Sequence, residues 1–312
     1  MSILVVGSVA FDTIESPAGR AERCLGGAAT HFALAASFFT EVRVIAVVGE
    51  DFLPEHEAVL TRRGIDTRGI DHAPGKSFFW SGAYEGNLNE AQTRATELNV
   101  FSSFSPRIPA EYMDSEYLFL ANIDPVLQAE VRGKMPDVRM VCGDTMNYWI
   151  NGHAENLARV LPELDVLLIN DTEARLLGKD DNLVRAAHNV LAQGPKTLVV
   201  KHGEYGATAF FSKQSFPEEH QHHIAVPFRA PALPLAEVVD PTGAGDSFAG
   251  GFYGYIASQP KLTLEVFKRA LFYGGVMGSF AVERFGTERL AQLDPREIEE
   301  RFALFRQISH LD

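Results

Sequence analysis

The sequence predicts an α/β fold in which a mostly parallel central sheet has helices on both faces and a small β-sheet is added to it. Two observations lead to this prediction. Short apolar runs rich in β-branched residues alternate with segments of helical length, which is the rhythm of successive βαβ units. One stretch, residues 75–104, breaks this rhythm with aromatic and β-branched pieces that lack a helical period.

The elements of the central sheet follow one another along most of the chain. Buried strands are predicted where branched apolar runs occur, at residues 3–6, 42–48, 117–121, 140–142, 166–169 and 197–200. Helices of suitable length or period lie between them, at residues 28–39, 54–63, 125–135, 154–160, 171–177 and 183–193. With 312 residues and 46% hydrophobic content the chain can bury a large core, and we expect one domain over residues 1–312.

The interrupting stretch, residues 75–104, is expected to form antiparallel strands. Together with the loop at residues 12–25, these strands would make a small sheet that projects from the main body. Such a sheet either covers a site as a lid or pairs with a second subunit. An ordinary peripheral hairpin explains the pattern equally well.

Composition excludes several classes of protein. A formal net charge of −13 argues against a nucleic-acid surface, which needs clustered Lys and Arg. No run of 18 apolar residues and no secretion signal occurs, so neither membrane insertion nor secretion is expected. Cys24 and Cys142 follow no metal-ligand spacing and are expected as thiols in a reducing compartment, with the cytoplasm as the location.

A glycine-rich loop near the C-terminal end carries the strongest chemical signal. Gly243, Ala244 and Gly245 precede a helical segment that ends before Pro260. Small residues let the backbone turn its amides toward one point at a helix N-terminus, where the helix dipole also favours negative charge. Such an anion hole suits the oxygens of a phosphoryl group during transfer.

Asp246 lies in the first turn of that helix. Its carboxylate is placed to accept a proton from a hydroxyl that attacks phosphorus, but a helix-capping role accounts for it equally well. Gly250, Gly251 and Gly254 follow on the same helix and lower its propensity by about 1 kcal/mol each, which predicts that another element packs very close to them.

Two further polar groups have open interpretations. Asp144 follows the predicted strand at residues 140–142, at an edge where ligands of α/β sheets collect, and either faces a ligand or caps the next helix. The run His220-Gln-His-His223 is expected to be a solvated loop, because no third ligand is spaced for a closed metal site.

The segment Asp240-Pro-Thr-Gly-Ala-Gly-Asp246 resembles the C-terminal signature of the ribokinase or PfkB carbohydrate kinase family. The resemblance implies a ribokinase-like fold in which Asp246 is the catalytic base and the backbone of Gly243, Ala244 and Gly245 is the anion hole. It also implies that Asp240 lies near a metal or a monovalent cation such as K⁺. Pro241 departs from the pattern, since Thr is often found there.

Motifs at the start of the chain resemble the same family. Gly26 and Gly27 open a small-residue helix, as in the N-terminal signature, and the resemblance implies that they contact substrate. Asp12 resembles the aspartate that binds substrate hydroxyls. Ala10 and His31 stand where many sugar kinases have Asn, and both positions face substrate in the family.

Motifs in the middle of the chain complete the resemblance. Asn170 and Glu173 resemble the Asn-x-x-Glu motif that organises Mg²⁺ and phosphate. Lys201, Gly203 and Gly206 resemble the strand and turn that border the nucleotide. The resemblance extends from residue 4 to residue 251.

The resemblance implies an ATP-dependent kinase that uses Mg²⁺ and transfers the γ-phosphoryl group to a hydroxyl of a small metabolite. A sugar or sugar derivative is the expected acceptor. A nucleoside kinase of the same family, and a catalytically silent member that only binds its ligand, are the alternatives. A homodimer formed through the lid is expected.

Overall fold

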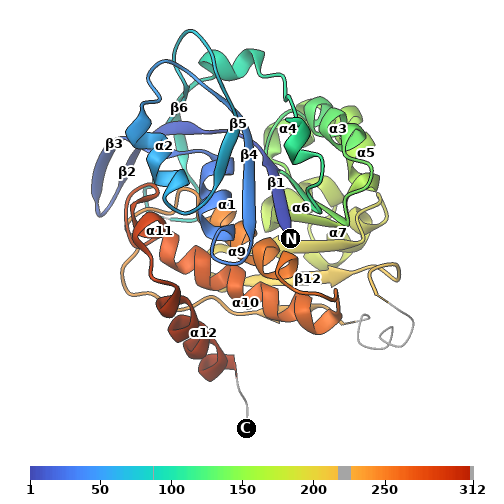
Figure 1. The fold of residues 1–312 in the computed structure, drawn as a ribbon. Coiled ribbons are helices and arrows are strands. Elements are labelled where there is room, and N and C mark those ends of the chain that lie inside the picture. The colour runs from blue at the N-terminus through green and yellow to red at the C-terminus, as the bar shows by residue number, and fades with distance from the viewer. Residues whose placement is uncertain (87, 217–225, 310–312) are drawn as a thin grey trace.

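The structure, a computed structural model, describes residues 1–86, 88–216 and 226–309. It contains a nine-stranded sheet between two layers of helices and a separate four-stranded sheet (Figure 1), as the sequence predicts. The run His220–His223 lies outside the described residues. Within the described part of the chain, no helix is long and apolar enough to cross a membrane. Cys24 and Cys142 are both free thiols.

The large sheet has the strand order β13-β12-β11-β10-β9-β8-β1-β4-β5. All neighbours from β11 to β5 pair in parallel, whereas β12 and β13 add an antiparallel edge. The strands are β1 Ser2–Val6, β4 Glu41–Val48, β5 Asp66–His72, β8 Tyr117–Leu120, β9 Met140–Asp144, β10 Val166–Asn170, β11 Thr197–Lys201, β12 Ala207–Phe211 and β13 Phe228–Ala230. The six predicted strands are confirmed, and β5, β12 and β13 were not predicted.

Alternating side chains of the strands face two separate cores. Ile3 and Val5 of β1 belong to one core cluster, and Leu4 and Val6 belong to the other. This follows from the two-residue period of a strand, and it explains why the parallel strands are apolar throughout. Helices α1 Ala28–Ala36, α9 Ala244–Ala257, α10 Leu264–Ala281 and α12 Pro295–Ser309 contribute to the first cluster. Helices α3 Pro125–Lys134, α5 Ala154–Val160, α6 Asp171–Gly178 and α7 Leu183–Leu191 contribute to the second.

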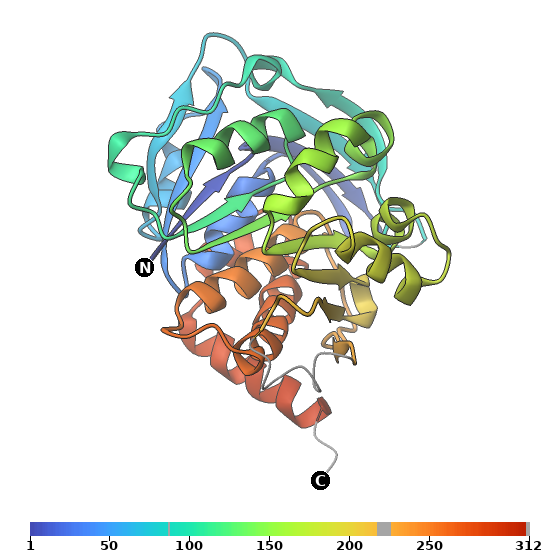
Figure 2. The ribbon, with the colours of Figure 1, turned by 90° about the vertical axis from the view of Figure 1, so that its right-hand side faces the viewer.

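The helices therefore cover both faces of the sheet. Figures 1 and 2 show the green helices that follow β8, β9 and β10 on one side of the strands and the orange helices α9 and α10 on the other. The helices are α1 Ala28–Ala36, α2 Pro54–Thr61, α3 Pro125–Lys134, α4 Asn147–Gly152, α5 Ala154–Val160, α6 Asp171–Gly178, α7 Leu183–Leu191, α9 Ala244–Ala257, α10 Leu264–Ala281, α11 Glu288–Gln292 and α12 Pro295–Ser309. The 3-10 helices are η1 Asn99–Ser103, η2 Ala110–Tyr112, η3 Leu161–Glu163 and η4 Gly203–Tyr205.

The close packing predicted along α9 is confirmed. A Cβ atom on Gly250 would overlap the carbonyl oxygen of Phe32 in α1, and one on Gly251 would lie 2.6 Å from the carbonyl oxygen of Tyr273 in α10. The glycines therefore let two helices approach the backbone of α9. This packing holds the N-terminus of α9 in place.

The small sheet has the order β3-β2-β6-β7, with β2 Ala10–Ser16, β3 Gly19–Gly26, β6 Phe78–Ala83 and β7 Gln92–Glu97. The predicted loop at residues 12–25 is thus a hairpin of two strands. The antiparallel strands predicted within residues 75–104 are confirmed by the β6–β7 pair. β2 and β3 are also antiparallel, whereas β2 and β6 pair in parallel. This parallel pair forms because β2 and β6 are joined through the main body rather than by a tight turn.

The prediction of strands over residues 75–104 is wrong at the end of this stretch, since Val100 and Phe101 lie in the 3-10 helix η1 Asn99–Ser103. A 3-10 turn aligns side chains three residues apart, and here it stacks Phe101 on Phe104 with ring centroids 5.3 Å apart. Phe78 of β6 stacks on the other side, at 5.4 Å. Aromatic packing therefore decides the local conformation.

Candidate active site

Three neighbouring parallel strands end in polar residues at one edge of the large sheet. Asp144 is the last residue of β9, Asn170 of β10 and Lys201 of β11. Asn170 and Lys201 are paired in register, and Asp144 pairs with Leu168 of β10. The carboxyl edge of a parallel sheet is where α/β proteins place their ligands.

The glycine loop meets this edge at the N-terminus of α9. Gly243 takes a left-handed conformation with φ 74° and is the N-cap of the helix. Asp240 stabilises the loop through two hydrogen bonds of 2.8 Å. One of its carboxylate oxygens accepts the Thr242 N–H, and the other accepts the Gly286 N–H. Asp240 is fully buried. Both of its oxygens thus already bind backbone amides, and its predicted place beside a cation stays a prediction.

Asp246 lies in the first turn of α9, near Asp144 and Lys201. The helix is capped by the backbone of Gly243, with no side-chain cap hydrogen bond. Burial, and after it the charge of Asp144, raises the pKa of Asp246 to about 7, while Lys201 lowers it. A carboxyl group with such a pKa can gain and lose a proton near neutral pH, which a general base requires.

Asn170 and Glu173 form a reciprocal capping box at the start of α6. The Asn170 side chain accepts the Glu173 N–H, and the Glu173 carboxylate accepts the Asn170 N–H, both at 2.8 Å. Burial, and then the charge of Asp144, raises the pKa of Glu173 to about 7. The other carboxylate oxygen of Glu173 is outside the capping box, in surroundings that favour a nearby cation.

These residues fit a magnesium ion that is shared with phosphate. Among the described residues, no three His, Cys, Asp or Glu side chains form a ready cage for a metal. Mg²⁺ is commonly bound by one or two carboxylates, waters and substrate phosphates rather than by such a cage. The half-buried Asn170 and the buried Glu173, both at the carboxyl edge of the sheet, match that incomplete set of ligands.

Asp12 approaches the same region from β2. It is buried, and a Cβ atom on Gly26 would overlap its carboxylate. Gly27 has φ 93°, and a Cβ atom there would lie 2.5 Å from the carbonyl oxygen of Ser8. The paired glycines are therefore needed to let β3 and α1 meet β2. Burial, and then the charge of Asp240, raises the pKa of Asp12 to about 7.

His31 lies in α1 with its ring against the glycine loop. A Cβ atom on Gly243 would overlap the imidazole carbons. Neither ring nitrogen has a hydrogen-bond partner, although the side chain is only 1% exposed. Burial lowers the pKa of His31 to about 4, so the ring is neutral at pH 7. A neutral imidazole offers a bound ligand one donor and one acceptor.

Gly203 and Gly206 shape the turn between β11 and β12, beside Lys201. Their φ angles are 56° and 95°, and a Cβ atom on Gly206 would overlap the carbonyl oxygen of Ala230. Asn89, from the segment between β6 and β7, lies directly against Gly203. The small sheet therefore reaches the turn that the sequence assigned to the nucleotide.

Tyr84 is a site residue that sequence reasoning did not single out. It follows β6, and its hydroxyl lies 3.1 Å from the hydroxyl of Thr242 in the glycine loop. Burial raises the pKa of Tyr84 to about 12, and the charges of Asp240, Asp12 and Asp246 add to the shift. No local pattern in the sequence marks a tyrosine for a contact with a loop so distant in the chain.

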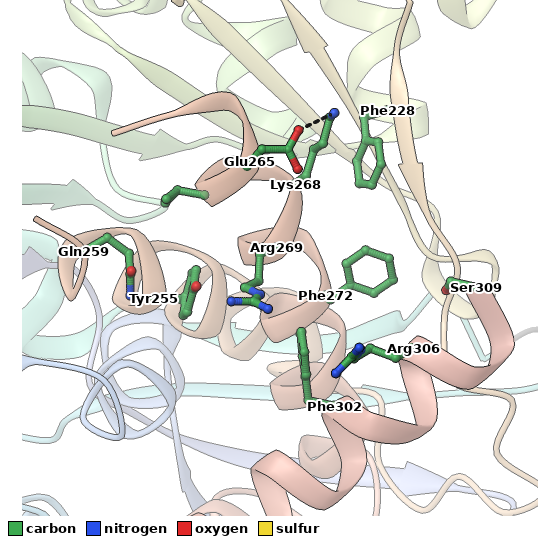
Figure 3. Close-up of a pocket in the computed structure, with 11 residues that line it drawn as sticks. Phe228, Tyr255, Gln259, Glu265, Lys268, Arg269, Phe272, Phe302, Arg306 and Ser309 are labelled. Atoms are coloured by element: carbon green, nitrogen blue, oxygen red, sulfur yellow. Dashed lines mark hydrogen bonds and ion pairs between the residues drawn. The ribbon is translucent and has the colours of Figure 1, made fainter. Parts of the chain in front are cut away.

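A groove elsewhere on the surface is separate from this site. A groove of about 650 Å³ lies on the outer side of α10 and α12 (Figure 3). Arg269 and Arg306 point into it beside the rings of Phe272 and Phe302. None of the residues at the carboxyl edge of the large sheet contributes to its lining.

The residues of the candidate site thus combine an amide-lined helix N-terminus, a buried carboxylate of raised pKa and one buried lysine. Residues 129–292 match the pfkB family of carbohydrate kinases. This range contains Asn170, Glu173, Lys201 and the glycine loop, whereas Asp12 lies before it. The chain is also 28% identical over 270 residues to a cytidine kinase of Thermococcus kodakarensis, which covers 83% of this chain and 90% of that protein.

The fold is similar to that of solved kinases. A Burkholderia thailandensis nucleoside kinase in complex with inosine has a TM-score of 0.77 at 19% identity and covers 97% of this chain and 98% of its own. A putative ribokinase II from E. coli in complex with ATP and Mg²⁺ has a TM-score of 0.77 at 20% identity, with 97% and 99% covered. The chain belongs to the pfkB family of carbohydrate kinases and is a phosphotransferase with an alcohol group as acceptor.

Proposed function

We propose that this kinase transfers the γ-phosphoryl group of ATP to a hydroxyl of an uncharged metabolite that carries a sugar, and that a ribonucleoside is the acceptor. The observation that carries the proposal is the convergence of Asp12, Asp240 and Asp246. Burial is the main cause of the raised pKa of Tyr84, and the charges of these three carboxylates raise it further. Burial is likewise the main cause of the raised pKa of Asp12, and the charges of Asp240 and Asp246 add to it. An acceptor that bears a phosphate or a carboxylate would be repelled there.

In the proposed reaction, the acceptor oxygen forms a bond to the γ-phosphorus while the bond from that phosphorus to the β-phosphate oxygen breaks. Asp246 takes the proton of the acceptor hydroxyl. The backbone amides of Gly243, Ala244 and Gly245 stabilise the charge on the oxygens of the transferring group. ADP and a phosphate monoester are the products.

Mg²⁺, when bound, would neutralise phosphate charge in the way common to kinases. We assign Asn170 and Glu173 to hold it, together with water and phosphate oxygens. We assign Gly203 and Gly206 to the border of the nucleotide. A monovalent cation beside Asp240 stays a prediction of the resemblance, and its dependence is measured by comparing turnover in potassium and sodium buffers of equal ionic strength.

The acceptor would be held by Asp12, which can accept hydrogen bonds from two neighbouring hydroxyls. Gly26 and Gly27 bring the backbone close to it. His31 would add one hydrogen bond from its unpartnered ring nitrogens. A carboxylate that binds paired hydroxyls and a neutral ring that fills the next position suit a ribosyl group.

The small sheet would close over this acceptor and exclude water, which otherwise competes for the phosphoryl group. Its edge strands β3 and β7 would also pair a second copy of the chain into a homodimer. Light scattering of the intact chain tests the dimer, and a monomer mass contradicts it. We place the reaction in the cytoplasm, where ATP is supplied and Cys24 and Cys142 stay reduced.

The relatives named above support a nucleoside as acceptor, because a cytidine kinase and an inosine-bound nucleoside kinase are among them. A free sugar is the second candidate, since the matching family is described as carbohydrate kinases. The test is ADP release in a coupled assay with ribonucleosides, deoxyribonucleosides, pentoses, hexoses and inositols. A ribonucleoside should give the highest kcat/KM. A higher value for a free sugar, or for a phosphorylated or carboxylated sugar, would overturn the proposed acceptor.

A further inference from the structure

Lys201 is a buried cation placed directly against the anion hole. Its Nζ lies 3.2 Å from the position that a Cβ atom on Gly245 would take. The side chain is 17% exposed, so it is largely withdrawn from solvent. A charge in such surroundings acts more strongly on a neighbouring phosphate than a charge in water.

Asp144 fixes the position of this lysine from the end of β9. One of its carboxylate oxygens lies 3.6 Å from Lys201 Nζ, and the other accepts the Thr145 N–H at 2.8 Å. The Asp144 carbonyl oxygen accepts a hydrogen bond of 3.0 Å from the buried amide of Gln128. Asp144 is thus held from both its main chain and its side chain, and it does not cap α4, whose N-cap is Met146.

The pair leaves the lysine available to a ligand. A separation of 3.6 Å is an ion pair but too long for a hydrogen bond, so the three N–H groups of the ammonium are not used up by Asp144. Burial by itself would lower the pKa of Lys201, but Asp144, Glu173 and Asp246 raise it, and the side chain stays charged. Asp144 is thus the ion-pair partner of the ammonium, and Glu173 and Asp246 lie near enough to raise its pKa.

The carboxyl groups near Lys201 also affect a bound nucleotide when they are ionised. The γ-phosphate of ATP must come close to Asp246 for transfer, and the carboxylates there would repel it. The ammonium of Lys201 and the amides of the glycine loop are the groups that attract it. Lys201 Nζ lies beside Gly245, so the ammonium and this part of the glycine loop are close neighbours.

We propose that Lys201 is a catalytic residue that binds the γ-phosphoryl group and stabilises it during transfer, and that Asp144 is the positioning residue that holds it. This inference rests on the proposed function. The step is the one given above: the γ-phosphorus exchanges its bond to ADP for a bond to the acceptor oxygen, Asp246 receives the proton, and Lys201 keeps all of its own protons. The nucleotide-border role from the resemblance does not distinguish the γ-phosphate from the rest of ATP.

A purely structural role for Lys201 makes different predictions. If the ammonium only neutralised buried carboxylates, its loss would lower stability and weaken ADP and ATP binding alike. If it binds the γ-phosphoryl group, its loss should weaken binding of ATP but not of ADP. The ratio of the two affinities separates these roles without any acceptor.

The experiment compares Lys201→Met, Lys201→Arg, Lys201→Ala and Asp144→Asn with the matched control Lys196→Met. Lys196 precedes β11 at the opposite end of the strand and forms an ion pair of 2.7 Å with Asp165. For each variant, calorimetry measures the affinity for ADP and for a non-hydrolysable ATP analogue with Mg²⁺. Initial rates give kcat and KM with the best acceptor, and thermal unfolding and circular dichroism monitor the fold.

We expect Lys201→Met to lower kcat by about 10²–10³-fold, as for the loss of one donor to a developing oxyanion. Affinity for the ATP analogue should fall by at least about tenfold, the value of a charged hydrogen bond, while ADP affinity stays within about twofold. Added alkylammonium should restore part of the turnover of Lys201→Ala, and Lys201→Arg should keep part of it. Asp144→Asn should lose about tenfold in kcat without rescue by amines, and Lys196→Met should behave as wild type.

A kcat within about threefold of wild type in Lys201→Met would overturn the proposal. An equal loss of ADP and ATP affinity would overturn it as well and favour the structural role. Unchanged kcat in Asp144→Asn would remove its positioning role. If no acceptor is found, the proposed function fails but the affinity ratio still decides: a lost preference for ATP supports Lys201, and a retained preference rejects it.

Discussion

The carboxyl edge of the large sheet and the small sheet contrast in how firmly they are held. The strands that end in Asp144, Asn170 and Lys201 are buried along nearly their whole length. By contrast, nearly every residue of β7 and half of those of β3 are exposed. The groups with proposed catalytic roles thus lie on a close-packed element, and the proposed cover lies on one with little core of its own.

The small sheet is tied to the glycine loop and the main body by a few polar contacts. Tyr84 meets Thr242, and the Ser16 hydroxyl donates to the carbonyl oxygen of Val239 at 2.6 Å. Arg23 of β3 binds Asp51 of the main body at 2.8 Å. Contacts of this kind are individually worth about 0.5–1.5 kcal/mol, which suits a cover that opens. We therefore expect substitutions at the carboxyl edge of the large sheet to lower kcat, and substitutions in the small sheet to change KM.

The largest expected effect comes from Asp246→Asn, at the rigid edge. The variant should fold and bind ATP but lose about 10²–10⁴-fold in kcat, because the general base is gone. Steady-state ADP release measures the loss. Glu15→Gln is the control from the small sheet, where Glu15 pairs with Arg94 at the surface. Near wild-type turnover in Asp246→Asn, or an equal loss in Glu15→Gln, would break the contrast between the regions.

A smaller effect concerns pH. The pKa of Asp246 is raised from 3.8 to about 7, mainly by burial, so the base form is lost as pH falls below about 7. We expect kcat/KM to fall about tenfold for each pH unit below about 7. The pKa of Asp246 is higher in the folded state than in the unfolded state. Its contribution to the free energy of unfolding is therefore present at pH 3.8 and below and disappears as pH rises through about 7. Asp246→Asn should therefore flatten the pH dependence of the Tm of the free enzyme.

Rate profiles from pH 5 to 9 and thermal unfolding over the same range provide both measurements. Tyr84→Phe, which removes a hydroxyl without changing any carboxylate, is the control and should keep the acid limb. A profile that is flat between pH 5 and 8 would contradict a raised pKa at Asp246.

The smallest expected effect is in the small sheet. Tyr84→Phe removes the contact with Thr242, worth about 0.5–1.5 kcal/mol, and should raise the KM of the acceptor by about two- to tenfold with little change in kcat. Trp80→Phe is the matched control, because the Trp80 indole donates to Thr93 within the same sheet. If Tyr84→Phe lowered kcat as much as Asp246→Asn, the small sheet would have to belong to the rigid part of the site.

Most of the large sheet followed from the sequence because its parallel strands are buried on both faces and read as unbroken apolar runs. Strand β5 was not predicted because its sequence, Asp66–His72, contains polar residues and a glycine. Such residues can occur in β5 because it is an edge strand of the sheet. The conformation around Phe101 was predicted wrongly, because its stacking against Phe78 is a tertiary contact that outweighs local β propensity.

The glycine loop could be identified from the sequence because its features are local. Gly243, Gly245 and Asp246 lie within four positions of each other, and backbone freedom, helix N-terminus and carboxylate follow from their order alone. The resemblance to the family added the expected partners Asp12 and Glu173. Whether these groups surround one point depended on how α9 packs against the sheet.

Tertiary structure alone decided the contacts between distant segments. Tyr84 and Thr242 are separated by 158 positions, and Ser16 and Val239 by 223, with no pattern in either segment that points to the other. Asp144 had two open interpretations until the ends of β9 and β11 placed it 3.6 Å from Lys201. Local sequence determines which backbone turns and caps form, whereas the meeting of side chains from separate strands depends on the packing of the whole sheet and its helices.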